Sequence, residues 1–315
     1  MKQRFIQVLV GLVGVALVAA IVLEVRPDWA LGAAMQFERG RAGLEQKTVS
    51  VGEHEITYLE GGSGSPLLLV HGFGGDKDNW TRLARYLTEH HRVIALDLPG
   101  FGESTRDESV SYDIIAQMER LYSFQQALSL GKVHLVGNSR GGQIVTHFAA
   151  VHRDAAASLT LLNARGVESP VLSDFDQILE TGLHPLIIRD VKDYEKILDW
   201  VFVDKPYIPR AVMAYFAKRA VLSHAFQQKV YADQKAKPAP LDDVLGQVKV
   251  PTLVAWGDHD RIIDPSTAEV FHLGIEGSQL VIIHDCGHMP QIEKAAKVSD
   301  LILSHVSSAS QARQP

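Results

Sequence analysis

The chain has 315 residues, of which 46% are hydrophobic and 22% are charged. This composition is typical of a globular protein that is long enough to bury a core and to shape a deep pocket. The net charge of −6 and the lack of a dense Lys/Arg block argue against a protein that binds nucleic acid. The single cysteine, Cys286, excludes an internal disulfide, and no Cys/His spacing indicates a zinc site.

The first 24 residues predict a membrane anchor. Lys2 and Arg4 precede an apolar run from Phe5 to Leu23, which at about 1.5 Å per helical residue nearly spans the core of a bilayer. A cleavable signal peptide is the alternative, with its cleavage site at Val18-Ala19-Ala20, but the apolar run continues beyond this point. We expect an uncleaved transmembrane helix over residues 1–24.

The residues around this helix predict its orientation and its surroundings. Positive charge before the apolar run favours a cytoplasmic N-terminus, although Arg26 follows the run closely, so we expect the body outside the cytoplasm. Residues 25–46 form a juxtamembrane segment that either lies at the headgroups or is a plain linker. The small pair Ala16-x-x-x-Ala20 leaves open a homodimer through the anchor.

Further along, short apolar segments alternate with helical patterns. The expected helices lie at 114–130, at 141–151 and from the last strand to about residue 305. The expected strands lie within 47–59 and at 66–70, 93–96, 133–136, 159–162, 252–256 and 280–283. Short apolar strands separated by helices predict an α/β fold with a mostly parallel sheet and helices on both faces.

Residues 166–244 interrupt this alternation. They combine helical patterns and scattered aromatic residues with several prolines, among them Pro185, Pro206, Pro209, Pro238 and Pro240, and they stand between two expected strands of the sheet. We therefore expect a helical cap inserted there, so that the core consists of residues 47–165 and 245–306. Residues 307–315 are rich in Ser and Gln and predict a frayed tail.

A candidate nucleophile stands between an expected strand and an expected helix, in Gly137-Asn138-Ser139-Arg140-Gly141. A sharp turn between two such elements needs small residues on both sides of the serine, here Gly137 and Gly141. Such a turn exposes the Ser139 hydroxyl at a helix N-terminus. The pentapeptide alone is modest evidence, and its place between strand and helix strengthens the prediction.

A serine nucleophile needs a base, and the base needs an orienting acid. His288 follows the last expected strand, and Asp258 and Asp260 follow the strand before it. The order Ser, Asp, His agrees with a serine presented on such a turn. We predict His288 as base and general acid. Either aspartate can orient it, and Asp258 has the alternative of capping its own turn.

Acyl transfer also needs two preorganised N–H donors for the oxyanion. The Gly-rich loop His71-Gly72-Phe73-Gly74-Gly75 follows an early strand and can present one donor. We predict the backbone amides of Phe73 and Arg140 as the two donors, with His71 and Gly72 supporting the loop. The alternative is that the loop is only a tight turn.

These residues together resemble the α/β-hydrolase superfamily, and in particular its bacterial lipase and esterase branch. The likeness is carried by HGFGGDKDNW (71–80), DLPGFGES (97–104), GNSRGG (137–142) and WGDHD (256–260). It implies an α/β-hydrolase fold with a catalytic triad of Ser139, Asp260 and His288, and an oxyanion hole of Phe73 and the residue after the nucleophile. It implies no metal and no organic cofactor.

The chain departs from that branch at Arg140, where Met is usual. Its backbone amide suffices for catalysis, so the departure bears on substrate preference. We expect its side chain either to attract an anionic head group or to form an ion pair with a nearby carboxylate.

An anchored and capped serine hydrolase predicts lipid esters as substrates, with phospholipid or lysophospholipid acyl chains foremost. We expect it in the bacterial inner membrane, with the catalytic domain in the periplasm. The same triad serves short-chain esterases, hydrolases of carbon–carbon bonds and perhydrolases, so these chemistries stay open. A catalytically inactive binding scaffold is a further alternative, and the complete triad counts against it.

Overall fold

The computed structural model describes residues 25–206 and 208–311. The predicted anchor over residues 1–24 lies outside this range, and no helix within the range is long and apolar enough to cross a membrane. The strands of the described residues form one sheet in the order β1-β2-β4-β3-β5-β6-β7-β8. Their bounds are β1 Leu44–Val51, β2 His54–Gly61, β3 Pro66–Val70, β4 Arg92–Leu96, β5 Val133–Asn138, β6 Ala156–Leu162, β7 Thr252–Gly257 and β8 Gln279–Ile283.

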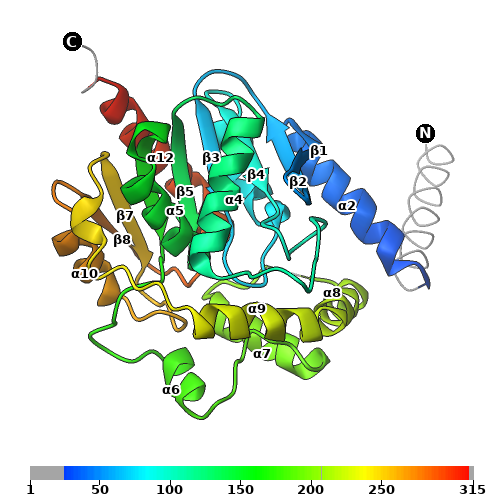
Figure 1. The fold of residues 1–315 in the computed structure, drawn as a ribbon. Helices are drawn as coiled ribbons and strands as arrows, with labels where there is room; N and C mark the ends of the chain where they lie inside the picture. The colour runs from blue at the N-terminus through cyan, green and yellow to red at the C-terminus, as the bar shows by residue number, and fades with distance from the viewer. Residues whose placement is uncertain (1–24, 207, 312–315) are drawn as a thin grey trace, which may run out of the picture.

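The sheet is mostly parallel, as predicted. Strands β1, β2 and β4 pair antiparallel, and from β4 to β8 all neighbours pair parallel. Figure 1 shows α4 and α5 on the near face and α12 on the far face. The core helices are η1 Lys77–Trp80, α3 Thr81–Leu87, α4 Ile114–Ala127, α5 Arg140–Val151, η2 Arg153–Ala155, η3 Leu245–Gln247, α10 Thr267–Gly274, α11 Pro290–Glu293 and α12 Ala295–Gln311.

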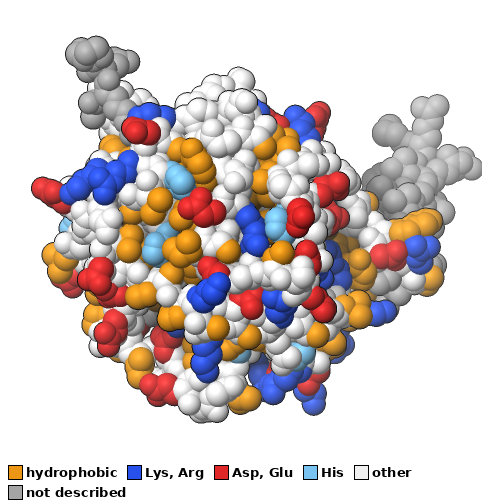
Figure 2. Space-filling model, in the orientation of Figure 1, with side chains coloured by type: hydrophobic (Ala, Val, Ile, Leu, Met, Phe, Trp, Pro, Cys, Tyr) orange, Lys and Arg blue, Asp and Glu red, His pale blue; other side chains and the backbone are white. Residues whose placement is uncertain are grey.

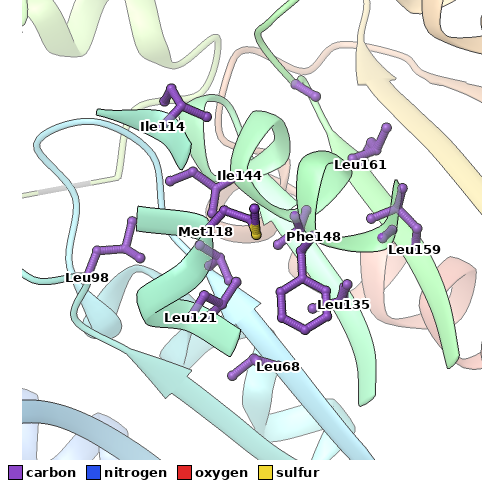
Figure 3. Close-up of a cluster of buried hydrophobic side chains, with 14 of the residues drawn as sticks. Leu68, Leu98, Ile114, Met118, Leu121, Leu135, Ile144, Phe148, Leu159 and Leu161 are labelled. Atoms are coloured by element: carbon purple, nitrogen blue, oxygen red, sulfur yellow. The ribbon is translucent and has the colours of Figure 1, made fainter. Parts of the chain in front are cut away.

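The central strands are buried on both faces because helices cover both. In β3, Leu68 and Val70 belong to one hydrophobic cluster, and Leu67 and Leu69 belong to another on the opposite face. This division follows from the period of two along a strand. Figure 3 shows the first cluster, in which Leu68 lies among side chains of α4, α5 and neighbouring strands. The apolar run at 66–70, which predicted a buried strand, is thus a central strand of the sheet.

Four helices stand between β6 and β7, in the segment that the prolines and helical patterns marked as an insertion. They are α6 Asp174–Glu180, α7 Val191–Val201, α8 Arg210–Leu222 and α9 His224–Ala236. Figure 1 shows α7, α8 and α9 together below the sheet. We refer to these four helices and their connections as the cap.

The segment before the sheet is a helix rather than a plain linker. Helix α2, Pro27–Arg41, has Pro at its first turn and basic residues in its last turn, where they suit the helix dipole. Its Arg39 forms an ion pair with Asp78, with 2.6 Å between Nη2 and Oδ2. Helix α2 lies against α3 of the core and α8 of the cap. The first strand begins at Leu44, three residues before the predicted start of the core.

The prediction of a frayed tail from residue 307 is wrong for residues 307–311. Helix α12 continues through Gln311, and the side chain of Ala309 is buried. Apolar contacts with the core stabilise the last turn of α12. The composition of residues 307–315, rich in Ser and Gln, does not show such contacts, so it did not predict the helix.

Candidate active site

Ser139 stands at a sharp turn between β5 and α5, as its motif predicts. Its backbone has φ +54° and ψ −120°, a left-handed conformation that is unfavourable for a residue with a side chain. Gly137 is required beside it, because a Cβ there would lie 2.6 Å from the Gly141 carbonyl oxygen. A Cβ on Gly141 would collide with the Val70 carbonyl oxygen. The turn therefore depends on both glycines.

His288 and Asp260 are hydrogen bonded. The His288 Nδ1 atom lies 2.8 Å from Asp260 Oδ2, and both side chains are buried. Asp260 Oδ1 accepts hydrogen bonds from the backbone N–H groups of Ile262 and Ile263, at 2.8 and 3.0 Å. A carboxylate fixed in this way holds Nδ1 as the protonated nitrogen of a neutral ring, so that Nε2 keeps a free lone pair.

Asp258, the other candidate for the acid, points to a different group of residues. Its carboxylate contacts His259 Nδ1 at 2.6 Å and His284 Nδ1 at 3.0 Å, and both histidines are exposed. It also accepts a hydrogen bond from the backbone N–H of Cys286. Asp258 therefore joins two surface loops, and Asp260 is the aspartate that contacts His288.

Asn163 also contacts the acid, and the sequence did not single it out. Its Nδ2 donates to Asp260 Oδ2 at 2.8 Å, and its Oδ1 accepts from the backbone N–H of Gly257 at 3.3 Å. Asn163 follows β6 and has φ +47°, a conformation that Asn tolerates better than most residues. An Asn directly after a buried strand was the one available signal, and it is common in turns.

Glu293 connects the loop of His288 to the cap. Its Oε2 accepts a hydrogen bond from the backbone N–H of Gly287 at 3.0 Å. Its Oε1 accepts from the backbone N–H groups of Val203 and Asp204, just after α7, at 3.2 and 2.9 Å. The backbone N–H of His288 in turn donates to the Val201 carbonyl at 2.8 Å. No pattern in the sequence predicts this connection.

The loop after β3 approaches the serine closely. A Cβ on Gly72 would lie 3.0 Å from Ser139 Cβ, and a turn closes where Gly75 N–H donates to the Gly72 carbonyl. Phe73 lies within this turn. Arg140 is the first residue of α5, so its N–H has no acceptor within the helix. The loop after β3 and the first turn of α5 thus both lie beside Ser139.

The comparisons with known proteins agree with this fold. A family model described as the alpha/beta hydrolase fold matches residues 65–186 and 212–295. The chain belongs to the α/β-hydrolase family. Lipase 1 of Psychrobacter immobilis is 35% identical, over 84% of this chain and 85% of that protein. Lipase 3 of Moraxella sp. (strain TA144) is 34% identical, over 82% of this chain and 84% of that protein.

A solved structure extends the likeness to most of the chain. The crystal structure of a membrane phospholipase A, described as a novel bacterial virulence factor, superposes with a TM-score of 0.89 and 41% sequence identity. The match covers 98% of this chain and 99% of the other. The fold and the lipase and phospholipase relatives show that this chain is a hydrolase.

In this α/β-hydrolase, His71 has a structural role in the loop after β3. Its Nδ1 donates to the Gly72 carbonyl at 2.7 Å, and its Nε2 accepts from the backbone N–H of Leu98 at 3.0 Å. Burial lowers the pKa of His71, which agrees with a neutral ring that donates once and accepts once. His71 therefore fixes the loop before Phe73.

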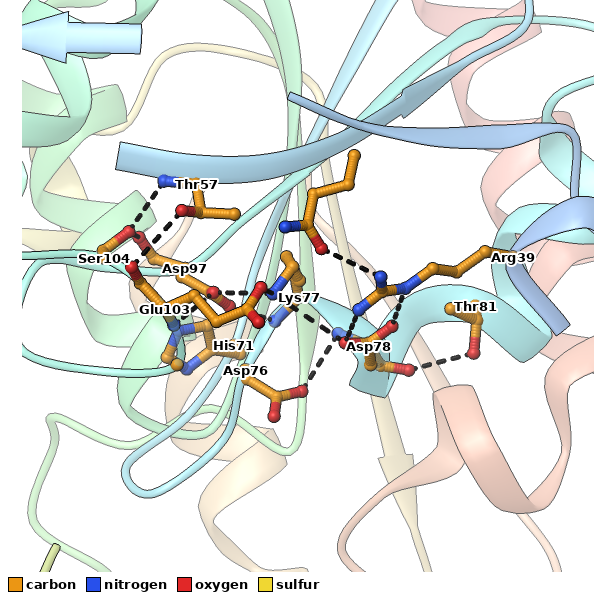
Figure 4. A network of polar contacts seen from close by, with 12 residues as sticks. Arg39, Thr57, His71, Asp76, Lys77, Asp78, Thr81, Asp97, Glu103 and Ser104 are labelled. Atoms are coloured by element: carbon orange, nitrogen blue, oxygen red, sulfur yellow. Dashed lines mark hydrogen bonds and ion pairs between the residues drawn. The ribbon is translucent and has the colours of Figure 1, made fainter. Parts of the chain in front are cut away.

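A buried ionic network holds the other end of that loop (Figure 4). Lys77 Nζ lies 2.9 Å from Asp97 Oδ2 and 2.8 Å from Glu103 Oε2. Asp78 pairs with Arg39 of α2. Burial, together with the charges of Asp78 and Asp97, raises the pKa of Asp76 to about 7. These ion pairs thus connect the loop after β3 to both the sheet and α2.

Ser139, His288 and Phe73 line one cavity of about 390 Å³ between core and cap. Its cap wall is apolar and includes Ile188, Ile197 and Phe216. An adjoining cavity of about 470 Å³ shares the wall formed by Tyr194, Ile208 and Phe216, and it extends to Leu31, Ala34 and Met35 of α2. The space beside Ser139 therefore extends toward helix α2.

The contacts of the Arg140 side chain contradict one of the two expectations for it, the ion pair with a nearby carboxylate. Within residues 25–206 and 208–311 no carboxylate forms an ion pair with it, and its Nη1 donates to Gln143 Oε1 at 3.0 Å. The alternative of an ion pair is therefore wrong for the described part of the hydrolase. Asp176 of the cap pairs with Arg165, at 2.8 Å between Oδ1 and Nη2.

Proposed function

We propose that this protein hydrolyses the carboxylic esters of lipids, as a phospholipase A, lysophospholipase or lipase. The observation that carries the proposal is that Ser139 and His288 face one apolar cavity while Asp260 holds His288 Nδ1 at 2.8 Å. The lipase and phospholipase relatives support the same chemistry.

The proposed reaction is a double displacement through an acyl-enzyme. The Ser139 hydroxyl attacks the ester carbonyl while His288 Nε2 takes its proton, and Asp260 stabilises the imidazolium that forms. The backbone N–H groups of Phe73 and Arg140 stabilise the oxyanion. His288 then returns the proton to the departing alcohol oxygen. In the second half, His288 activates a water that cleaves the acyl-Ser139 ester, releasing the fatty acid and restoring the hydroxyl.

A lipid substrate agrees with the shape and position of the cavities. Apolar cap side chains suit an acyl chain, and the adjoining cavity leads to α2, which follows the predicted anchor. Helix α2 exposes Trp29 and Phe37, each to 63%, and Figure 2 shows hydrophobic side chains at this right-hand end of the molecule. Such side chains suit the interface of a membrane. We propose that residues 1–24 anchor the protein in the inner membrane, with the body in the periplasm.

The first test is ester release by the full chain in detergent and by its Ser139→Ala variant. The panel contains p-nitrophenyl esters of increasing length and phospholipids. Activity on lipids that is lost in the variant, together with a fluorophosphonate label on Ser139, supports the proposal. Activity on short esters alone retains the mechanism and contradicts the lipid substrate. A folded protein that neither reacts nor takes the label is a binding scaffold.

A second test addresses the anchor. We expect the full chain to stay in the membrane fraction after washing with alkaline carbonate, and a chain that begins at residue 25 to be released. The Ser139→Ala full chain is the control for expression and should remain with the membrane. Release of the full chain by carbonate would contradict an integral anchor.

A further inference from the structure

Helix α9 of the cap contains a buried polar side chain, Gln227. Gln227 is 9% exposed, and its Oε1 has no hydrogen-bond partner among the described residues. An amide oxygen in such a place has lost its hydrogen bonds to water without gaining others, which is unfavourable. Native proteins contain few such groups, and a bound group or an ordered water commonly completes their hydrogen bonds.

Two other buried glutamines show the usual arrangement, in which a backbone carbonyl fixes the amide. Gln117 Nε2 donates to the Pro99 carbonyl at 2.8 Å, and Gln234 Nε2 donates to the Tyr112 carbonyl at 3.4 Å. Gln234 belongs to the same helix as Gln227. Within residues 25–206 and 208–311, no acceptor fixes Gln227 Nε2 in this way. The carboxamide of Gln227 is therefore free to bind a ligand.

Gln227 lines both of the cavities between core and cap. One is the cavity of about 390 Å³ that contains Ser139 and His288, and the other is the adjoining cavity of about 470 Å³ that extends to α2. Among the described cap residues that line the cavity of Ser139, only Tyr194 and Gln227 have polar side chains. The remaining cap wall suits an acyl chain, so Gln227 marks a place for a polar part of the substrate.

Gln227 also lies against the turn that adjoins the nucleophile. A Cβ on Gly74 would lie 3.8 Å from Gln227 Nε2, and a Cβ on Gly72 would lie 3.0 Å from Ser139 Cβ. Gly72 and Gly74 belong to one tight turn, which closes where Gly75 N–H donates to the Gly72 carbonyl at 3.1 Å. The carboxamide therefore lies close to the place where the ester of a bound substrate would react.

We propose that the Gln227 carboxamide binds a free hydroxyl on the alcohol part of the substrate while the ester lies at Ser139. This deepens the proposed function and rests on it. A hydroxyl suits the site because it accepts from Nε2 and can donate to Oε1 when the amide turns about its last side-chain bond, which is weakly restricted. An ester without the hydroxyl leaves the buried amide unpaired and is disfavoured. Gln227 thus determines specificity for lipid esters whose alcohol keeps a free hydroxyl.

The test compares the laurate monoester of ethylene glycol with propyl laurate, which has a methyl group in place of the hydroxyl. The readout is the ratio of kcat/KM on the hydroxyl ester to kcat/KM on the propyl ester, measured with the full chain in detergent. We expect the wild-type ratio to exceed the ratio of the two rates of hydrolysis by hydroxide. Gln227→Met keeps the length of the side chain, removes its hydrogen bonds and should lower the enzymatic ratio about fivefold. Gln234→Met is the matched control and should keep the wild-type ratio, because Gln234 is a buried glutamine of the same helix that lines neither cavity.

Three outcomes would overturn the inference and leave the proposed function standing. The first is a wild-type ratio no greater than that of hydroxide, which is measured without any variant and so does not depend on the folding of Gln227→Met. The second is a folded Gln227→Met that keeps the wild-type ratio, which would make the carboxamide purely structural. The third is an equal fall in Gln234→Met, which would assign the effect to packing of the cap. Failure of the wild type on both esters contradicts the proposed function itself.

Discussion

Glu293 Oε2 accepts a hydrogen bond from the backbone N–H of Gly287 at 3.0 Å, directly before His288. The other oxygen of the same carboxylate accepts two backbone N–H groups from the cap, those of Val203 and Asp204. One side chain therefore fixes the loop of the predicted base relative to the end of α7.

Replacing Glu293 by Gln should lower kcat more than it changes KM. An amide puts an N–H group opposite backbone donors, so about 1–3 kcal/mol of stabilisation is lost at the loop, and His288 loses its alignment. We expect kcat on p-nitrophenyl esters to fall at least tenfold and fluorophosphonate labelling of Ser139 to slow in parallel. Glu276→Gln is the control, since Glu276 is exposed. A fall in thermal stability with unchanged kcat would mean that Glu293 is only structural.

Replacing Asn163 by Gly tests whether the amide orients the acid. Gly keeps the positive φ of this position and removes the bonds to Asp260 and Gly257. Loss of a hydrogen bond to a charged group corresponds to about 1.5–3 kcal/mol, so we expect kcat to fall about tenfold or more. Ser129→Gly, at an exposed position with φ +50°, controls for the change in backbone freedom. Equal kcat in both variants and wild type would rule out an orienting role.

Replacing Ser139 by Gly should abolish hydrolysis and raise stability. The left-handed backbone of Ser139 is strained for any residue with a Cβ, and Gly relieves this strain. We expect Ser139→Gly to exceed Ser139→Ala in free energy of unfolding by about 1 kcal/mol, which denaturant titration measures. The usual order, with Ala more stable than Gly, would contradict strain at this turn.

The raised pKa of Asp76 predicts that the stability of the protein depends on pH. Its pKa is raised from 3.8 to about 7 in the folded protein, so between these values the folded state holds a proton that the unfolded state releases. The contribution of Asp76 to stability therefore falls as pH rises from about 4 to 7 and stays low above that. Asp76→Asn should be more stable than wild type at pH 8, and the difference in Tm should close toward pH 4. A difference that is independent of pH would contradict the raised pKa.

Local patterns in the sequence predicted the parts of this protein that are local in the chain. The apolar segments predicted the strands of the sheet because burial on both faces requires continuous apolar runs. The glycines around Ser139 predicted the turn because a sharp strand-to-helix turn leaves no room for a Cβ. The likeness to α/β-hydrolases, and with it the fold and hydrolase activity, was likewise readable from short motifs. Helix α2 and the last turn of α12 were missed because packing against distant segments stabilises them.

The tertiary structure alone decided which side chains meet. Asp258 and Asp260 are two residues apart, and which of them contacts His288 depends on how the loop turns after β7. Asn163 and Glu293 contact the site from distant segments. The only signal in the sequence was the place of Asn163 directly after a buried strand, which is common for Asn in turns. That no carboxylate of the described residues pairs with Arg140 is likewise a property of the folded interface. Hydrogen bonds and ion pairs depend on distances between residues far apart in the chain, and a sequence pattern contains only local spacing.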